Sequence, residues 1–211
     1  MTDLNCQNNT SNISDTTRNA LEELGNIGAG NAATSLSVML SSELKITPPE
    51  VELCEFNDLE EKIGGADATV VGVLSDISGD MNAKMLFILG IEDTKKLVKA
   101  LIGDSADWFS DMGMSAVKEI ANIIIGSYVA SLESLSGIKV RHALPQICID
   151  MAGAILSVPC IEFGMVSDQA LLINSHFMNG KNELDGYIML LSEMHSFNLL
   201  LNRLGIGGID E

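Results

Sequence analysis

The 211-residue sequence has few basic residues, few aromatic residues and no long apolar run. It contains 12 Lys and Arg against 29 Asp and Glu, so its formal net charge is −17. This charge repels phosphate backbones and anionic lipids, which makes nucleic acids and membrane surfaces poor partners. No run of 18 uncharged apolar residues is present, and the first residues lack the basic-then-apolar order of a signal sequence. We therefore expect a cytoplasmic protein with no membrane insertion.

Cysteine and histidine are also scarce, and they are scattered along the chain. The four cysteines are Cys6, Cys54, Cys148 and Cys160, and the three histidines are His142, His176 and His195. The cysteines show no C-x-x-C spacing and no histidine cluster accompanies them, so neither a zinc site nor a disulfide framework is supported. We interpret the histidines as surface or hydrogen-bonded interior residues. The sequence predicts no metal site and no cofactor of the protein's own.

What the sequence does contain is enough apolar material for a core. Hydrophobic residues make up 46% of the chain, which excludes general disorder. Residues 1–14 are the exception, because they are rich in Asn, Ser and Thr and have little to bury. We expect these residues to be a flexible tail and residues 15–211 to form the folded domain.

The strongest pattern is an internal repeat at a fixed offset of 96 positions. Three residues of the first half recur in the second half, so that Glu23, Asn26 and Pro49 match Glu119, Asn122 and Pro145. A small polar residue stands four positions before each Glu, and these residues are Asn19 and Ser115. Taken singly, a Glu and an Asn three positions apart would be ordinary solvated surface. Their recurrence with the same spacing indicates a duplication and favours a shared function.

Both copies of the repeat have helical spacing. At 100° per residue, one sector of each helix holds the repeated polar residues together with a glycine, Gly30 or Gly126. The opposite stripes are Leu21, Leu24, Gly28, Ala32 and Met39 in one helix, and Val117, Ile120, Ile124, Tyr128 and Leu135 in the other. We expect these stripes to face a core and each Glu and Asn to point outward. A glycine one turn beyond each Asn would let another protein approach the carboxamide closely.

The order of the remaining elements predicts class α+β, as a single domain of two pseudo-symmetric repeats with a largely antiparallel sheet and two long helices. We place repeat one at about 15–103, a hinge at 104–114 that contains Trp108 and Phe109, and repeat two at about 115–205. Predicted helices cover 16–41, 92–102, 115–135 and 193–204. Predicted strands cover 51–56, 69–77, 83–89, 147–150, 154–158, 169–177 and 187–191, with hairpin turns at 78–80 and 179–180. Pro49 and Pro145 are expected to be structural, each ending the loop that returns a helix to its strand.

Residues 28–33 match the dinucleotide-binding pattern G-x-G-x-x-A, but their context argues against it. A phosphate-binding turn of this kind follows a buried strand and opens a helix. Here the preceding residues already carry helical spacing, so the two glycines lie inside a helix. The second copy keeps only Gly126 of the pair, so the duplication has not preserved a phosphate loop.

The repeated pattern of a small polar residue, Glu, Asn and Pro resembles the CheC family of bacterial chemotaxis phosphatases, which includes CheX and FliY. The segment LEELGNIGAGNAATSLS is itself similar to the family's first helix, and the resemblance covers residues 15–205, nearly the whole chain. The family implies one motif in CheX and an additional carboxy-terminal domain in FliY. Two motifs without such a domain resemble the CheC branch. Asn19 departs from the Asp or Ser of the family, whereas Ser115 conforms.

The resemblance implies a hydrolase that removes the phosphoryl group from an aspartate of the response regulator CheY. On this interpretation Asn26 and Asn122 orient the attacking water, and Glu23 and Glu119 pair with the regulator's active-site lysine. The only metal implied is Mg²⁺ bound to the substrate CheY. Both sites are expected to work, the second more dependably. The alternative is a mainly non-enzymatic adaptor that binds CheD, a receptor-modifying deamidase, in response to phospho-CheY.

Overall fold

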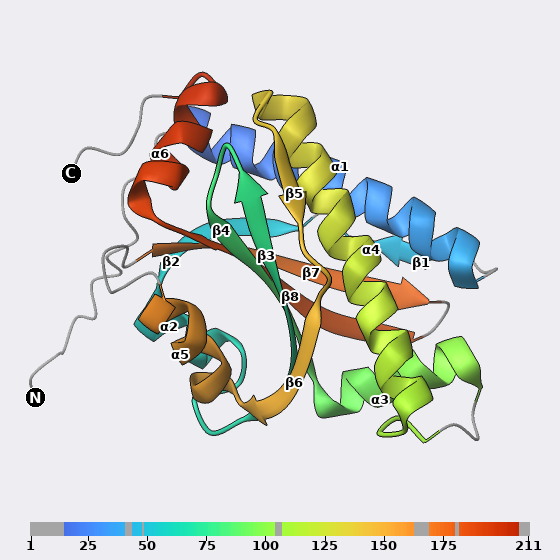
Figure 1. The fold of residues 1–211 in the computed structure, drawn as a ribbon. Coiled ribbons are helices and arrows are strands. Elements are labelled where there is room, and N and C mark those ends of the chain that lie inside the picture. Colours follow the sequence, from blue (N-terminus) through green and yellow to red (C-terminus); the bar gives the residue numbers. More distant parts are fainter. Residues whose placement is uncertain are drawn as a thin grey trace, which may run out of the picture.

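The computed structural model describes residues 15–40, 44–47, 49–103, 107–162, 169–179 and 182–206 (Figure 1). The first half comprises α1 (Asp15–Leu40), β1 (Leu44–Ile46), β2 (Glu50–Glu55), α2 (Phe56–Lys62), β3 (Thr69–Gly79), β4 (Ala83–Gly90) and α3 (Ile91–Ile102). The second half comprises α4 (Asp111–Ser136), β5 (Val140–His142), β6 (Gln146–Met151), α5 (Ala152–Glu162), β7 (Gln169–Asn179), β8 (Asn182–Ser192) and α6 (Met194–Arg203). The two halves therefore share one order of helices and strands.

The described strands form one eight-stranded sheet that runs through both halves. The order along the sheet is β1-β7-β8-β4-β3-β5, and β2 also pairs with β7 while β6 pairs with β3. Every pairing between described strands is antiparallel. The predicted class α+β, with a single domain made of two repeats, is confirmed.

The two halves exchange strands across the sheet. The first two strands of each half pair with the third strand of the other half, so Glu50 lies opposite Asn174 and Gln146 lies opposite Leu74. These two pairings occupy equivalent places in the two copies. Because the sheet of each half is completed by the other, the repeats cannot be separate globular units.

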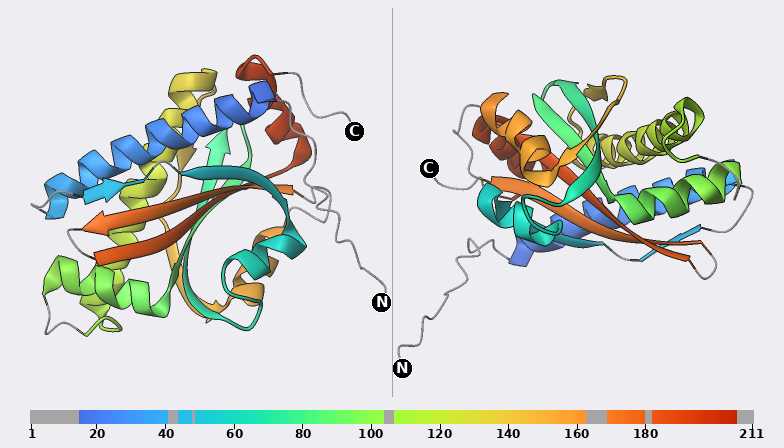
Figure 2. Two further views of the ribbon diagram at one scale, coloured as in Figure 1. Left: turned by 180° about the vertical axis from the view of Figure 1, so that it is seen from behind. Right: turned by 90° about the horizontal axis from the view of Figure 1, so that it is seen from below.

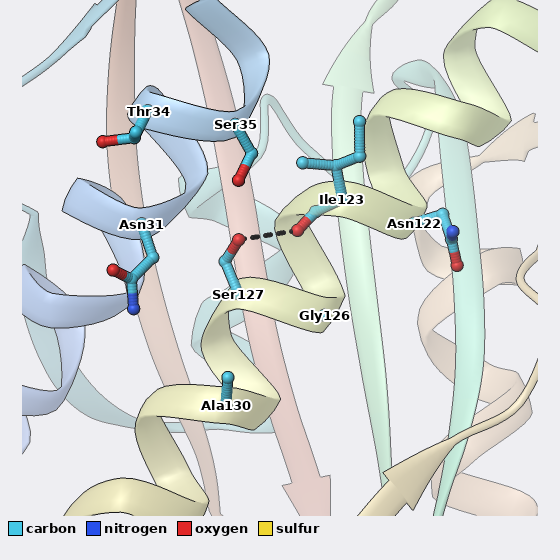
Figure 3. Close-up of a pocket in the computed structure, with 8 residues that line it drawn as sticks. All are labelled: Asn31, Thr34, Ser35, Asn122, Ile123, Gly126, Ser127 and Ala130. Carbon is cyan, nitrogen blue, oxygen red and sulfur yellow. Dashed lines mark hydrogen bonds between the residues drawn. The ribbon is translucent and has the colours of Figure 1, made fainter. Parts of the chain in front are cut away.

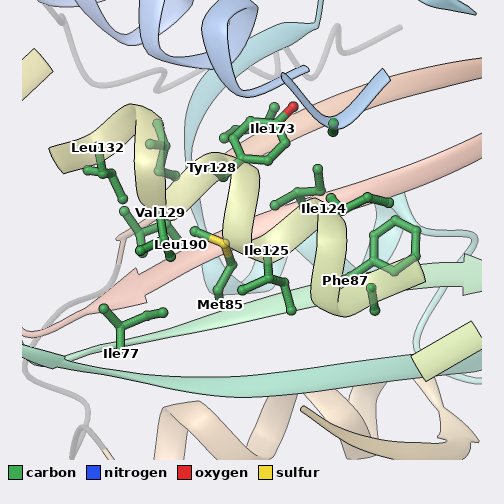
Figure 4. Close-up of a cluster of buried hydrophobic side chains, with 14 of the residues drawn as sticks. Ile77, Met85, Phe87, Ile124, Ile125, Tyr128, Val129, Leu132, Ile173 and Leu190 are labelled. Carbon is green, nitrogen blue, oxygen red and sulfur yellow. The ribbon is translucent and has the colours of Figure 1, made fainter. Parts of the chain in front are cut away.

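Helices cover both faces of the sheet (Figure 2). The larger core lies between one face and helices α1, α3, α4 and α6, and the smaller core lies between the opposite face and helices α2 and α5. In β4, Met85 and Phe87 belong to the larger core, whereas Leu86 and Ile88 belong to the smaller one. A strand covered on both faces favours apolar residues at successive positions, which explains the apolar run from Met85 to Leu89 in β4. Figure 4 shows Tyr128 and Ile124 of α4 over the sheet residues Phe87 and Ile173.

The predicted strand at residues 154–158 is wrong, because these residues belong to helix α5. Ile155 and Leu156 are buried in the smaller core, while Val158 is 48% exposed. The apolar stripe of this helix packs on α2, a short helix that the sequence did not predict. The short strands β1 and β5 were not predicted either.

The two long helices were predicted with small errors. Helix α4 begins at Asp111 instead of residue 115, so the end of the predicted hinge is helical. The Ser110 hydroxyl caps this helix by accepting a hydrogen bond from Gly113 N at 3.1 Å. In α1 the predicted core stripe is buried except for Met39, which is 37% exposed. Met39 lies in the last turn of the helix, beyond the part that packs on the core.

The hinge and the ends of the chain are only partly described. Trp108 packs against the larger core with Lys95 Nζ 6.0 Å from its ring centroid, whereas Phe109 is 63% exposed. The predicted tail at 1–14 and the turn residue Gly180 lie outside the described residues. The hairpin joined by that turn is present, with Asn179 opposite Asn182.

In the described ranges, no helix is both long and apolar enough to cross a bilayer.

Candidate functional site

The candidate site is carried by α1 and α4, which pack against each other on the same face of the sheet. Gly28 of α1 lies against the ring of Tyr128 of α4. The Ser131 hydroxyl, which is completely buried, donates hydrogen bonds to Tyr128 O at 2.8 Å and to Leu24 O at 3.3 Å. Small residues and a buried hydroxyl thus bring the two helix backbones together. This packing fixes where the outer faces of both helices lie.

The repeated residues of α1 lie on its outer face. Asn19, Glu23, Asn26 and Gly30 are all exposed. The neighbouring residues Leu21 and Leu24 are each 1% exposed and belong to the larger core. The helix is therefore anchored by one face and presents the Glu and Asn side chains to solvent on the other.

The repeated residues of α4 take equivalent positions. Ser115 and Glu119 are exposed, and Asn122 and Gly126 are partly exposed. Figure 3 shows Asn122 on the side of α4 that faces away from α1. The second motif thus lies on the outer flank of the helix pair and not in the contact between the two helices.

The four Glu and Asn side chains are not used to stabilise the fold. Among the residues that the structure describes, the side chains of Glu23, Asn26, Glu119 and Asn122 form no hydrogen bond or ion pair with other protein groups. A carboxamide offers both donors and an acceptor, and a carboxylate offers only acceptors. Their full hydrogen-bonding capacity is therefore open to an incoming molecule.

The two prolines of the repeat are both buried. Pro49 lies under Gly25, the residue before Asn26, and a Cβ built on Gly25 would be 3.0 Å from Pro49 Cγ and 2.8 Å from Val51 Cγ2. Pro145 is buried at the equivalent place in the second copy. The contact of Pro49 links the loop after α1 to the turn that carries Asn26, and the structural role of both prolines stays a prediction.

An open groove of about 480 Å³ runs between α1 and α4 and reaches Asn122. It is lined by Asn31, Thr34, Ser35, Asn122, Ile123, Gly126, Ser127 and Ala130 (Figure 3). Two of the hydroxyls bond within their own helix, since Thr34 donates to Gly30 O at 2.9 Å and Ser127 donates to Ile123 O at 2.8 Å. The sequence did not indicate this groove, because apart from Asn122 and Gly126 its residues belong to neither the motif sector nor the core stripe of either helix.

The structure places Gly28 and Gly30 in the interior of α1, with helix on both sides. They do not form the strand-to-helix turn that a dinucleotide-binding fingerprint requires. Gly28 is instead required by the close approach of Tyr128. Within the described part of the chain, no group of three or more His, Cys, Asp and Glu residues could hold a metal ion.

Comparisons with known proteins agree with the duplication. The model of the CheC-like family matches residues 17–53 and 112–149, one segment in each repeat. The chain is 29% identical to the CheY-P phosphatase CheC of Bacillus subtilis over 192 residues, which cover 88% of this chain and 92% of that protein. It is 23% identical to the flagellar motor switch phosphatase FliY of the same organism, over 64% of this chain and 36% of that protein.

The fold is also found in a solved relative. The crystal structure of Thermotoga maritima FliY superposes with a TM-score of 0.71 at 19% identity, covering 92% of this chain and 98% of that one. Both matched segments of the family model contain the repeated Glu, Asn and Pro. This chain therefore resembles the CheC-like family in the two matched segments, in its similarity to CheC over most of both chains and in its fold.

Proposed function

We propose that this protein is a phosphatase that hydrolyses the aspartyl phosphate of a CheY-type response regulator. The observation that carries the proposal is the duplicated Glu and Asn pair, exposed or partly exposed on equivalent helix faces and unused by the fold. The names of the two Bacillus subtilis relatives, a CheY-P phosphatase and a motor switch phosphatase, support the same activity.

In the proposed reaction the carboxamides of Asn26 and Asn122 position water. When a phosphorylated regulator docks on α1 or α4, the Asn reaches its phosphoaspartate and holds a water in line with the P–O bond to be broken. The water oxygen forms a new bond to phosphorus, the aspartate carboxylate leaves with the bonding electrons, and inorganic phosphate is released. An uncharged carboxamide can orient water through its donors and its acceptor without repelling the phosphoryl group.

The carboxylates of Glu23 and Glu119 have a different role in the proposal. Each lies one helical turn before its Asn on the same face, where it can pair with a lysine of the regulator's active site. That ion pair would fix the register of the regulator on the helix, so that the Asn meets the phosphoryl group. Neither residue acts as a nucleophile, and Mg²⁺ belongs to the substrate. Catalysis is then largely positioning, as with the water-orienting Gln of GTPases.

Decay of the phosphorylated regulator tests this proposal. Regulator carrying a ³²P-labelled phosphoryl group is mixed with excess Mg²⁺ and either the wild-type protein or the Asn26→Ala/Asn122→Ala variant. The wild-type protein should hasten the loss of label and the double variant should not, while both bind Mg²⁺-loaded regulator and unfold at the same urea concentration. Equal rates with wild-type and double-variant protein would exclude this role for the two Asn residues.

A partner-binding role is the second candidate, and it would use a different surface. Helix α5 exposes Val158 at 48% and Ile161 at 78% on the side of the sheet opposite α1 and α4. Exposed apolar residues on one helix suit a protein partner such as CheD, the deamidase that the family resemblance implies. A Val158→Ser/Ile161→Ser variant that loses CheD binding but keeps phosphatase activity would separate the two roles. Unchanged CheD binding would exclude α5 as the docking surface.

A further inference from the structure

His142 lies beside the motif face of α4, although it is distant from the motif in the sequence. It is the last residue of β5, where it pairs with Ile77 of β3, and β5 packs against α4. A Cβ built on Gly126 would be 3.4 Å from His142 Nε2. Gly126 is one helical turn from Asn122 on the same helix face. The edge of the imidazole ring is therefore part of the surface that surrounds the second motif.

The orientation of the His142 ring is set by its other nitrogen. His142 Nδ1 lies 3.2 Å from Ala143 O, and a carbonyl oxygen can only accept a hydrogen bond. Nδ1 therefore carries the proton in this contact. In the neutral ring, Nε2 is then left with a free lone pair and acts as an acceptor.

Gly126 leaves this acceptor uncovered. At 3.4 Å, the Cβ of any other residue would be in tight contact with Nε2 and would stand between the ring and an approaching molecule. The half-buried ring keeps its Nε2 edge next to the one position of the motif face that has no side chain. A donor group on a molecule that covers Asn122 and Gly126 would thus meet His142 directly.

The first motif has no counterpart to this residue. The strand registers make Ile46 the equivalent of His142, since Ile46 lies opposite Phe177 in the first copy of the pairing and His142 lies opposite Ile77 in the second. The Glu, Asn, Gly and Pro of the motif are the same in both copies. The imidazole therefore distinguishes the second site from the first chemically.

We propose that His142 is a partner-contacting residue of the second site, whose Nε2 accepts a hydrogen bond from the phosphorylated regulator docked on α4. The inference rests on the proposed phosphatase function and adds a specificity-determining residue to one of its two sites. The group that it recognises is a donor, a backbone N–H, a hydroxyl or an ammonium, at the edge of the regulator's phosphorylation site. His142 contributes to binding and does not touch the reacting atoms.

Single-site proteins test the inference. In the Asn26→Ala protein only the second site works, and in the Asn122→Ala protein only the first. His142→Ile should raise the KM for phosphorylated regulator about three- to tenfold in the Asn26→Ala protein, which is the range of one hydrogen bond, with kcat unchanged. The same change should leave the KM of the Asn122→Ala protein unaltered. His142→Gln, whose carboxamide can still accept a hydrogen bond, should recover most of the lost affinity.

The possible failures are distinguishable. If the Asn26→Ala protein is active and its KM is unchanged by His142→Ile, the inference is overturned while the phosphatase function stands. An equal rise of KM in both single-site proteins would also overturn it, because it would indicate a general effect of β5 on the fold. If wild-type protein does not hasten dephosphorylation at all, the phosphatase function fails and the role of His142 fails with it.

Discussion

Gly28 of α1 and Tyr128 of α4 fit together so closely that a Cβ built on Gly28 would be 2.5 Å from Tyr128 Cδ1. The ring of Tyr128 is 1% exposed, so it cannot move toward solvent without leaving the core. At the offset of 96 positions, Gly28 corresponds to Ile124 and Tyr128 corresponds to Ala32. In both pairs the small residue belongs to α1 and the large one to α4. The two copies of the helix have therefore diverged in a complementary way while keeping the same motif face.

Replacing Gly28 by Ala should destabilise the protein. The added methyl group would overlap the Tyr128 ring, and overpacking a well-packed core typically costs about 1–3 kcal/mol. This cost should outweigh the gain of about 1 kcal/mol that Ala brings to a helix interior. Urea unfolding followed by circular dichroism should show a lower midpoint with an unchanged slope.

Gly30→Ala is the matched control for this change, because a Cβ built on Gly30 has no atom within 4 Å. Only the helix-propensity gain should remain, so the unfolding midpoint should stay the same or rise. A Gly28→Ala protein as stable as the Gly30→Ala protein would contradict the close contact between Gly28 and Tyr128.

Lys84 predicts a pH dependence of stability. Its Nζ is bonded to Asp76 and lies 2.8 Å from Glu162 Oε2, while the residue is only 6% exposed. Burial alone would lower the pKa of Lys84, but the hydrogen bonds and charges of Asp76 and Glu162 together raise it above the ordinary 10.5. The stabilisation that these ion pairs give the folded protein is therefore complete below pH 10.5. It is lost as the pH rises through the higher pKa of Lys84 in the folded state.

The free energy of unfolding should consequently fall between pH 10 and pH 12, and a Lys84→Met variant should show a smaller fall over this range. Met keeps most of the apolar stem and removes the charge. The difference between the two proteins isolates Lys84 from the other lysines, including Lys96, whose pKa is raised by its hydrogen bond to Asp93. Parallel pH curves would show that the ion pairs of Lys84 contribute nothing measurable.

The sequence predicted the motif helices and hairpins well because their signals are local. Segments rich in Val, Leu, Ile and Phe and the turn chemistry at 78–80 specify β3 and β4, and the 3.6-residue period specifies α1 and α4. The offset between equivalent residues of the two copies changes after β2 and β6, and this change also has a local cause. Helix α5 has 11 residues against seven in α2, about one additional turn, and β7 begins 100 positions after β3 instead of 96.

The errors concern features that depend on tertiary contacts. Residues 154–158 form a short apolar run that could be strand or helix, and only packing against Leu59 and Ile63 of α2 in the smaller core selects helix. The sequences of β1 and β5 do not indicate that each pairs with a strand of the other half, since each strand has only three residues. His142 had no visible role in the sequence because its neighbour Gly126 lies on a different element.

The two sites should not be equivalent. Asn19 stands where the second copy has Ser115, and His142 has no counterpart in the first copy. We therefore expect Asn122→Ala to reduce turnover of phosphorylated regulator more than Asn26→Ala. Both changes are at solvent-accessible positions and should alter the free energy of unfolding by less than about 0.5 kcal/mol. Equal losses of turnover in the two variants would contradict this ranking.

The glycines of the motif should also differ in their effect on activity. Gly126→Ala places a methyl group over His142 Nε2 and at the partner-facing surface, whereas Gly30→Ala adds one to an open surface. In single-site proteins, Gly126→Ala should raise the KM of the second site more than Gly30→Ala raises that of the first. Identical shifts in KM would mean that the methyl group acts only by its bulk.

The central claim is that solvent-accessible Asn side chains on α1 and α4 position water against a regulator's aspartyl phosphate. The most direct test is the first-order decay of phosphorylated regulator, in excess Mg²⁺, with the wild-type protein and with the Asn26→Ala/Asn122→Ala variant. We predict that the double variant loses about 10²-fold or more of the rate acceleration, equivalent to about 3 kcal/mol, while remaining folded. A folded double variant that accelerates the decay as much as the wild-type protein would contradict the account.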